Sequence, residues 1–375
     1  MLQALAASPV IPSPESVHVI SDDRMEQRLK DAIVAPGTPL TEALKRLDAN
    51  GMGVLLLATA DRRLVGIITD GDVRRHILAG GSLAVSCESI ASRHPRVANR
   101  GMTTSELLDL MGGSRDDTVD HLPVLTDDGI VVGLVLRRDL VAADDTFTAV
   151  IMAGGYGKRL MPLTTDTPKP LLPVGDRPLM ERTIERMRRA GIRRVNVATH
   201  YLSDKITDHF GDGREFGVEM RYVTEDRPLG TAGALRLMEA PTGPLLVVNG
   251  DILTGVNYQD MLAYHRENGA IATVGVRKYD LEVPYGVIDC SGVAVSALRE
   301  KPVQQFLVNA GMYLLDPAAV AYIPQGERFD MTDLIQRLLA EGRKVVAFPV
   351  VEYWLDIGKP ADYERAQQDV LQVRA

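Results

Sequence analysis

An internal repeat is the sequence feature that most restricts how this chain can fold. The stretches "RRLVGIITDGDVRR" and "GIVVGLVLRRDLVA" both run from an apolar strand pattern into a helical pattern. Gly66 and Gly133 lie 67 residues apart, and Asp72 and Asp139 have the same separation. Each copy is predicted to form helix, strand, turn, strand, helix. Two such units are expected to bury their open apolar faces against each other.

Length and composition limit the classes of protein that fit. The chain has 375 residues, enough for two or three domains. A formal net charge of −8 argues against a basic face for nucleic acid or for an anionic membrane. Cys87 and Cys290 are the only cysteines and show no metal-like spacing, which favours a reducing compartment.

The first residues are predicted to be a tail. "MLQALAASPVIPSP" has no Lys or Arg before its apolar part and contains three prolines, unlike a signal peptide. No apolar run approaches the ~20 residues that span a bilayer. We therefore expect a soluble, cytoplasmic protein without nucleic-acid or membrane partners.

From Phe147 onward, short apolar runs alternate with helical stretches. This alternation predicts an α/β domain with a mainly parallel, mixed sheet covered by helices on both faces. The predicted boundaries are a tail over residues 1–22, the α+β repeat pair over residues 23–145 and the α/β domain over residues 146–375. Ligands of such sheets bind past the carboxyl ends of the strands, and Gly154 and Asp251 both follow predicted strands.

The segment "VIMAGGYGKRLMPLTTDTPKPLLPVGDRPLM" predicts a polyphosphate site. It fails the P-loop pattern at Met152 and Arg159, and the dinucleotide fingerprint at Leu160. What remains is a glycine-rich turn whose backbone amides can approach a polyphosphate closely. Arg159 and Lys169 add cations. The alternative is a cationic surface turn.

The repeat resembles a tandem pair of cystathionine-β-synthase (CBS) domains over roughly residues 25–143. Thr69 and Asp72 match the family's nucleotide-contact pattern, in which the aspartate accepts hydrogen bonds from ribose hydroxyls. The second copy keeps Asp139 but has Leu136 in place of the hydroxyl residue. The resemblance implies a regulatory nucleotide at Thr69, Asp72 and Asp139. The alternative is that both aspartates only cap the helices that follow them.

Residues 147–375 resemble the sugar-1-phosphate nucleotidylyltransferases, a family with a Rossmann-like nucleotidyltransferase domain. The landmarks are the glycine-rich segment, "EDRPLGTAGAL", "VVNGDIL", "YGVI", "REKP", "NAGMYLL" and "YWLDIG", in that order. The resemblance implies nucleotide binding by Ala153, Gly154, Gly155, Gly157, Arg159, Lys169, Glu225, Gly230 and Thr231. It implies sugar binding by Gly286, Glu300, Lys301 and Asn309, Mg²⁺ binding by Asp251 and Asp356, and catalysis by Arg159, Lys169, Asp251 and Lys301.

The chemistry of this reaction suits the residues present. A sugar 1-phosphate oxygen attacks the α-phosphorus of a nucleoside triphosphate, so catalysis is mostly positioning and charge neutralisation. Carboxylates at strand ends suit Mg²⁺, and the cations suit the triphosphate. Other interpretations stay open: Asp251 as a cap, Asp356 as a turn residue, and Glu300 with Lys301 as a solvated ion pair.

The substrates are the least determined part of the prediction. A CBS pair fused to this domain resembles the guanylyltransferases of bacterial surface-sugar pathways, such as those for legionaminic acid, mannose or heptose. GTP and glucosamine 1-phosphate are therefore preferred, with UTP or dTTP as alternative donors. A second class of function is a non-catalytic nucleotide-sensing regulatory subunit. "DDTFTAV" leaves a short link before the α/β domain, so we expect the two parts to pack and the CBS pair to support a homo-oligomer.

Overall fold

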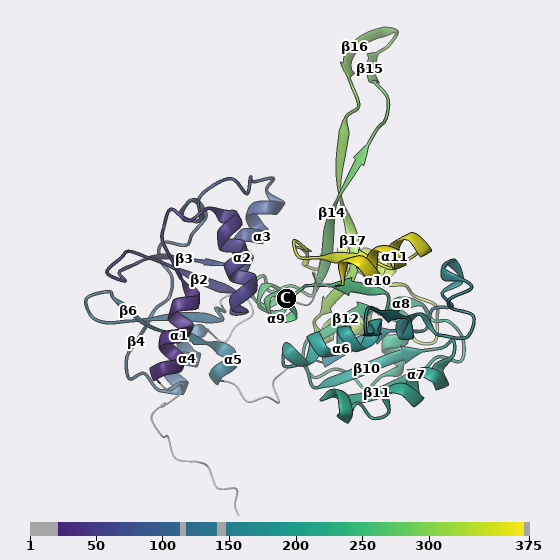
Figure 1. The fold of residues 1–375 in the computed structure, drawn as a ribbon, viewed down its shortest axis with the longest axis horizontal. Coiled ribbons are helices and arrows are strands. Elements are labelled where there is room, and N and C mark those ends of the chain that lie inside the picture. The colour runs from purple at the N-terminus through teal and green to yellow at the C-terminus, as the bar shows by residue number, and fades with distance from the viewer. Residues whose placement is uncertain (1–21, 113–117, 141–147, 371–375) are drawn as a thin grey trace, which may run out of the picture. The chain divides into compact units, whose positions relative to one another are not determined.

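The computed structural model describes residues 22–112, 118–140 and 148–370 (Figure 1). The chain divides into two compact units, residues 1–72 with 83–142 and residues 73–82 with 143–375. The predicted tail and the predicted short link fall almost entirely outside the described residues, so both stay predictions.

Two copies of one small α/β motif form the first unit. In the first copy β1 is parallel to β2, which is antiparallel to β3, and β4, β5 and β6 repeat this order in the second copy. The predicted repeat is therefore confirmed. The strands are β1 (Ile33–Val34), β2 (Val54–Ala58), β3 (Leu64–Thr69), β4 (Ala98–Asn99), β5 (His121–Leu125) and β6 (Val131–Leu136). The helices of the two copies are α1 (Asp22–Ala32), α2 (Leu40–Asn50), α3 (Asp70–Leu78), α4 (Thr104–Met111) and α5 (Arg137–Leu140), with a 3₁₀ turn at Cys87–Ser89. Residues 73–78 of α3 are grouped with the second unit.

The two copies share one apolar core. Leu56 of the first copy and Leu134 of the second are both fully buried in the same cluster. His121, at the start of β5, hydrogen-bonds through Nε2 to the carbonyl oxygen of Met52 at 2.9 Å. Neither copy could bury this apolar face alone, which is the physical reason that the motif occurs twice.

A seven-stranded mixed sheet forms the centre of the second unit, in the order β11-β10-β7-β12-β17-β14-β18. The first four strands are parallel, β17 is antiparallel to both of its neighbours, and β14 and β18 are parallel. The sheet strands are β7 (Thr148–Met152), β10 (Arg194–Thr199), β11 (Glu219–Thr224), β12 (Leu245–Asn249), β14 (Ala272–Glu282), β17 (Val303–Leu315) and β18 (Val345–Pro349). The helices are α6 (Leu179–Arg189), α7 (Ser203–Phe210), α8 (Gly230–Gly233), α9 (Tyr258–Glu267), α10 (Met331–Ala340) and α11 (Pro360–Asp369). This is the predicted fold class.

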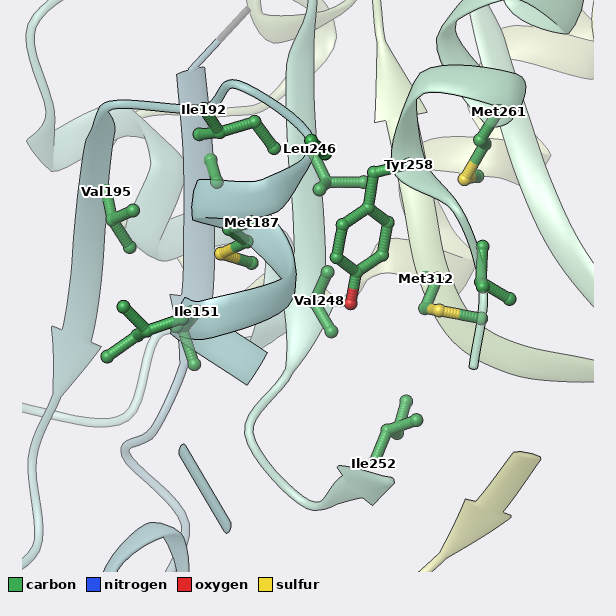
Figure 2. Close-up of a cluster of buried hydrophobic side chains, with 14 of the residues drawn as sticks. Ile151, Met187, Ile192, Val195, Leu246, Val248, Ile252, Tyr258, Met261 and Met312 are labelled. Carbon is green, nitrogen blue, oxygen red and sulfur yellow. The ribbon is translucent and has the colours of Figure 1, made fainter. Parts of the chain in front are cut away.

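Apolar residues cover both faces of this sheet. Along β12, Leu246 and Val248 belong to one core cluster, and Leu245 and Val247 to another. Successive side chains of a strand point to opposite faces, so β12 is buried on both sides. Figure 2 shows the first cluster, in which Met187 lies beside the strand residues Ile151 and Val248.

Short two-stranded sheets complete the second unit. β13 (Ile252–Thr254) pairs antiparallel with β19 (Trp354–Asp356), and β8 (Pro173–Val174) pairs with β9 (Arg177–Pro178). β14 and β17 extend beyond the sheet and end in the hairpin formed by β15 (Val287–Ser291) and β16 (Ala294–Arg299). This extension projects from the rest of the second unit (Figure 1).

Within the described residues, no helix combines the length and the apolar character that crossing a membrane requires.

Candidate active site

A cavity of about 300 Å³ opens at the carboxyl ends of β7 and β12. It is lined by residues 152–156, 169–170, 225, 228, 230–231 and 249–251. Eight of the residues predicted for the nucleotide or the metal therefore lie together: Ala153, Gly154, Gly155, Lys169, Glu225, Gly230, Thr231 and Asp251. The arrangement places this cavity where α/β sheets bind their ligands.

The glycine-rich turn forms one wall of the cavity. A Cβ on Gly155 would meet nothing within 4 Å, so the backbone faces open space. Gly157 has a φ of +62°, and a Cβ there would lie 2.8 Å from Cγ2 of Thr164. The Thr164 hydroxyl donates to the carbonyl oxygen of Gly157 at 2.8 Å and fixes the turn. Only glycine satisfies both restrictions at position 157.

Strand pairing brings the two predicted metal carboxylates together. In the β13–β19 register, Ile252 stands opposite Asp356, and the Ile357 amide donates to the Asp251 carbonyl oxygen at 3.0 Å. Asp251 therefore lies beside Asp356, although 105 positions separate them in the sequence. The Lys169 ammonium donates to Oδ2 of Asp251 at 2.6 Å, and both side chains are mostly buried.

Electrostatics mark Asp356 as a group that needs a positive partner. Burial raises the pKa of the Asp356 carboxyl, and the nearby charge of Asp251 raises it further, while Lys169 and Arg159 lower it. Oδ1 of Asp356 is buried and has no hydrogen-bond partner. Two close carboxylates with an unpaired oxygen suit a divalent cation, because a cation offsets both the desolvation and the mutual repulsion.

The predicted base-contacting segment has structural contacts of its own. A carboxylate oxygen of Glu225 accepts from the Leu229 amide at 2.8 Å, and burial raises the pKa of Glu225. The Thr231 hydroxyl accepts from the Met331 amide at 2.8 Å. Gly230 has a φ of +81°, which favours glycine. Nucleotide contacts by these residues stay predictions.

The four residues predicted to bind the sugar do not line the cavity. Gly286, Glu300, Lys301 and Asn309 are all exposed, and none is among the lining residues. A Cβ on Gly286 would lie 3.1 Å from Oε2 of Glu300, so these two motif segments stay together on the β14–β17 extension. Gly157 and Arg159 follow the lining residues in the sequence, and Nη1 of Arg159 would lie 3.5 Å from a Cβ on Gly358.

Sequence reasoning missed two features of the cavity. His200 links Tyr156, whose hydroxyl lies 3.1 Å from Nε2, to the Glu225 carbonyl oxygen, which lies 2.9 Å from Nδ1. Asn249 lines the cavity with a buried Oδ1 that has no hydrogen-bond partner. His200 directly follows β10, and Asn249 is the last residue of β12. Their positions at the ends of parallel strands could have identified them from the sequence, because ligands bind there.

The predicted regulatory residues lie in the first unit. Oδ2 of Asp72 accepts from the Thr69 amide at 2.8 Å and from its hydroxyl at 2.9 Å, while the Asp72 amide donates to the Thr69 hydroxyl at 3.2 Å. This is a capping box at the start of α3. Asp139 accepts from Arg28 at 2.6 Å. A nucleotide contact by any of the three stays a prediction.

Comparisons with known proteins agree with this arrangement. Residues 148–373 match the nucleotidyl transferase family model, and residues 28–79 and 87–145 match the CBS domain model. The chain is 33% identical to a mannose-1-phosphate guanylyltransferase of Mycobacterium tuberculosis, over 60% of this chain and 64% of that protein. It is also 33% identical to a UTP–glucose-1-phosphate uridylyltransferase of Synechocystis, over 60% of this chain and 63% of that protein.

A solved structure, HddC from Yersinia pseudotuberculosis, is 26% identical, with a TM-score of 0.47, and covers 60% of this chain and all of that one. The alignments to the two curated relatives span less than two thirds of the length of each. The family match itself extends over more than half of this chain and includes the whole cavity. The chain therefore belongs to the nucleotidyl transferase family and carries two CBS domains ahead of the family domain.

Proposed function

We propose that this protein transfers a nucleotidyl group from a nucleoside triphosphate to a sugar 1-phosphate, releasing pyrophosphate. One observation carries the proposal: Lys169 and Asp251 form an ion pair in the lining of the cavity that the glycine-rich turn also lines, and strand pairing brings Asp356 beside Asp251. A polyanionic donor needs backbone amides and cations, and both are present. The curated relatives supply the reaction class by name.

The chain's own residues have separate tasks in this reaction. The turn at residues 153–157 approaches the phosphates with backbone amides, and Arg159 balances the charge that develops on the leaving pyrophosphate. Lys169 neutralises phosphate oxygens beside Asp251. A sugar 1-phosphate oxygen forms the new bond to the α-phosphorus as the bond to pyrophosphate breaks. The nucleophile is already ionised, so no strong general base is required.

Asp251 and Asp356 would hold a divalent cation, Mg²⁺ by preference. No group of three or more His, Cys, Asp or Glu side chains suited to a metal occurs in the described part of the chain. Two carboxylates still fit, because Mg²⁺ commonly takes one or two carboxylates and fills its other positions with water and substrate phosphate oxygens. When bound, the ion neutralises charge on the reacting phosphate.

For the donor we propose GTP, and for the acceptor glucosamine 1-phosphate. The support is the resemblance of the fused CBS pair to guanylyltransferases of surface-sugar pathways. The two curated relatives described above do not decide between the bases, since the guanylyltransferase and the uridylyltransferase are both 33% identical to this chain. The cytoplasmic setting likewise remains a proposal, with both cysteines free.

A product screen tests the reaction. Purified protein is given Mg²⁺, one of five nucleoside triphosphates and one of a panel of sugar 1-phosphates, and pyrophosphate release is measured. We expect the highest specificity constant with GTP. A higher value with UTP or dTTP would overturn the donor assignment and leave the reaction class intact. No release with any pair would overturn the reaction class and favour a nucleotide-sensing regulatory protein.

Asp251→Asn tests the metal carboxylate. Loss of one charge aimed at the reacting phosphate is expected to lower turnover on the order of 10²–10³-fold at saturating Mg²⁺. Asp208→Asn is the matched control, since Asp208 is an exposed carboxylate on α7, away from the cavity lining. Equal turnover in the two variants would show that Asp251 is not a metal ligand required for catalysis.

A further inference from the structure

His200 stands between the two segments that are predicted to hold the nucleotide. In the sheet, β10 lies between β7 and β11, and His200 is the first residue after β10. The glycine-rich turn follows β7, and the segment that begins with Glu225 follows β11. These two segments leave strands that are not neighbours, so a side chain directly after β10 is placed to reach both of them.

Both ring nitrogens of His200 have a partner. Nδ1 lies 2.9 Å from the carbonyl oxygen of Glu225, and Nε2 lies 3.1 Å from the hydroxyl of Tyr156. A carbonyl oxygen only accepts, so in the neutral ring Nδ1 carries the hydrogen and the Tyr156 hydroxyl donates to Nε2. The two bonds therefore run in one direction, from Tyr156 through His200 to Glu225.

The side chain of Tyr156 is held by further contacts. Its ring meets the His200 ring edge-on with centroids 5.6 Å apart, and the Tyr201 ring lies 5.3 Å away. The Tyr201 hydroxyl donates to the carbonyl oxygen of Thr165 at 3.0 Å, farther along the same loop. The ammonium group of Lys158 is 5.3 Å from the Tyr156 ring centroid. Tyr156 is thus fixed at the end of β10, although it lines the cavity and is 43% exposed.

Fixing Tyr156 matters because glycines surround it. Gly154 and Gly155 precede it and Gly157 follows it, and glycine has more backbone freedom to lose than any other residue. When a triphosphate binds, the amides of this turn must become ordered around the phosphates, and that ordering costs free energy. A turn that is already fastened at Tyr156 has part of this cost removed before the triphosphate arrives.

The other end of the link fixes a second wall of the cavity. The Glu225 amide donates to the Thr199 carbonyl oxygen at 3.0 Å, and a Glu225 carboxylate oxygen accepts from the Leu229 amide at 2.8 Å. Glu225 is buried and lines the cavity together with Gly230. The bond from His200 to the Glu225 carbonyl oxygen therefore joins the predicted base-contacting segment to the glycine-rich turn.

We propose that His200 is a positioning residue for the nucleoside triphosphate. It fastens the glycine-rich turn to the base-contacting segment, so that both are in place before the triphosphate binds. The inference rests on the proposed nucleotidyl transfer. His200 is not among the residues that line the cavity, so it acts through Tyr156 and Glu225. Its effect falls on the affinity for the triphosphate, and the turnover number and the affinity for the sugar 1-phosphate do not depend on it.

Conservative variants separate the two bonds of His200. His200→Asn places an amide nitrogen near the position of Nδ1 and keeps a donor for Glu225, but it does not reach Tyr156. His200→Gln places its amide near the position of Nε2 and keeps a partner for the Tyr156 hydroxyl. Tyr156→Phe removes that hydroxyl and keeps the ring. KM for the triphosphate, KM for the sugar 1-phosphate and kcat are measured on the full chain for each variant, alone and combined with Tyr156→Phe.

Tyr156→Phe and His200→Asn should each raise KM for the triphosphate about 5-fold, the size expected for the loss of one hydrogen bond. The double variant should show the same change of about 5-fold, because both substitutions remove the same bond. In His200→Gln, the addition of Tyr156→Phe should raise KM again, because the hydroxyl still has its partner there.

Three results would overturn the proposal. One is an unchanged KM for the triphosphate in Tyr156→Phe. Another is a change of about 25-fold in the double variant with His200→Asn, which is the product expected for independent effects. The third is a loss shared by both KM values and kcat, which would assign His200 a general structural role.

Tyr222→Phe is the matched control. The Tyr222 hydroxyl donates to the carbonyl oxygen of Gly211 at 2.8 Å, and Tyr222 is not among the residues that line the cavity. This variant also loses one tyrosine hydrogen bond, and it should leave both KM values unchanged.

Calorimetric titration in the presence of Mg²⁺ and without sugar 1-phosphate gives a readout that does not depend on catalysis. Each of the five nucleoside triphosphates is titrated into wild-type protein, and the one that binds most tightly is used for the variants. Its Kd should rise about 5-fold in Tyr156→Phe and in His200→Asn. Wild-type protein that binds none of the five would overturn the positioning role. Failure of the proposed function is distinguishable, because wild-type protein would then bind a triphosphate and release no pyrophosphate with any substrate pair.

Discussion

At the scale of single residues, burial decides what several side chains do. Burial raises the pKa of Asp356 and lowers the pKa of His121. Both shifts favour the neutral form of the side chain. For Asp356 the proposed cation would offset that cost. His121 has a different partner, since its Nε2 faces a backbone carbonyl oxygen, and it serves the contact between the two CBS copies.

The lowered pKa of His121 predicts how the stability of the first unit depends on pH. Burial lowers the pKa of His121 below its usual 6.5, and the opposing charge of Asp120 offsets this only in part. Below pH 6.5 the unfolded chain therefore binds a proton that the folded chain does not. The free energy of unfolding should be constant above this pH and should fall as pH drops below it, by at most about 1.4 kcal/mol per pH unit.

Urea unfolding at pH 7.5, 6 and 5 measures this dependence. His121→Gln keeps a donor for the Met52 carbonyl oxygen and should flatten the loss between pH 6.5 and 5. His94→Gln, at an exposed position, should leave the wild-type dependence unchanged. A wild-type stability that rises toward pH 5 would contradict the assignment.

At the scale of elements, the close approach of two strand ends shapes the cavity. The Gly250 amide donates to the Met152 carbonyl oxygen at 2.9 Å, where β12 and β7 end side by side. A Cβ on Gly250 would lie 2.7 Å from that same oxygen, closer than real contacts allow. Glycine at 250 therefore lets the chain turn directly into Asp251.

Gly250→Ala should separate the two strand ends and displace Asp251. We expect turnover to fall about 100-fold, because small misplacements of catalytic groups have effects of this size. The midpoint of thermal unfolding should fall as well. Gly243→Ala is the control, since a Cβ there meets nothing within 4 Å, and it should change neither quantity. Unchanged turnover in Gly250→Ala would show that the approach is not required.

The elements that sequence could predict are those set by local pattern. The 67-residue repeat gave the paired motif, and the alternation after Phe147 gave a sheet with helices on both faces. The cavity at the strand ends followed from the same pattern, with Gly154, Lys169 and Asp251 lining it. Each of these depends on residues close in sequence, where hydrophobic periodicity is informative.

The hydrophobic pattern of the sequence could not predict which strands pair when they are far apart in the chain. Nothing local to Asp356 indicates that β19 pairs with β13 and brings it to Asp251. The exposed extension of β14 and β17 was likewise unpredicted, because the alternation of Tyr279 and Leu281 with charged residues looks the same in a strand that covers its own core. A pattern specifies which face is apolar and leaves open which surface covers it.

At the scale of the whole molecule, the chain joins a pair of CBS domains to a domain of the nucleotidyl transferase family. A ligand in the CBS pair can change catalysis only if it binds two arrangements of the protein with different affinity. Coupling of this kind typically changes affinity by about 5- to 150-fold, which is the upper range we expect for turnover. The capping box at Thr69 and Asp72 gives this hypothesis a precise residue to test.

We predict that an adenine or guanine nucleotide, or the nucleotide-sugar product, binds near Asp72 and changes turnover within that range. Asp72→Asn keeps an oxygen that can accept from the Thr69 amide, so the cap of α3 should remain. It loses the charge that accepts paired ribose hydroxyls, so the ligand response should disappear while unstimulated turnover stays intact. Asp109→Asn, an exposed carboxylate on α4, is the control and should keep the response. Calorimetric titration and initial rates are measured on all three proteins. If no nucleotide binds wild-type protein outside the active site, Asp72 serves only to cap its helix and the CBS pair serves assembly.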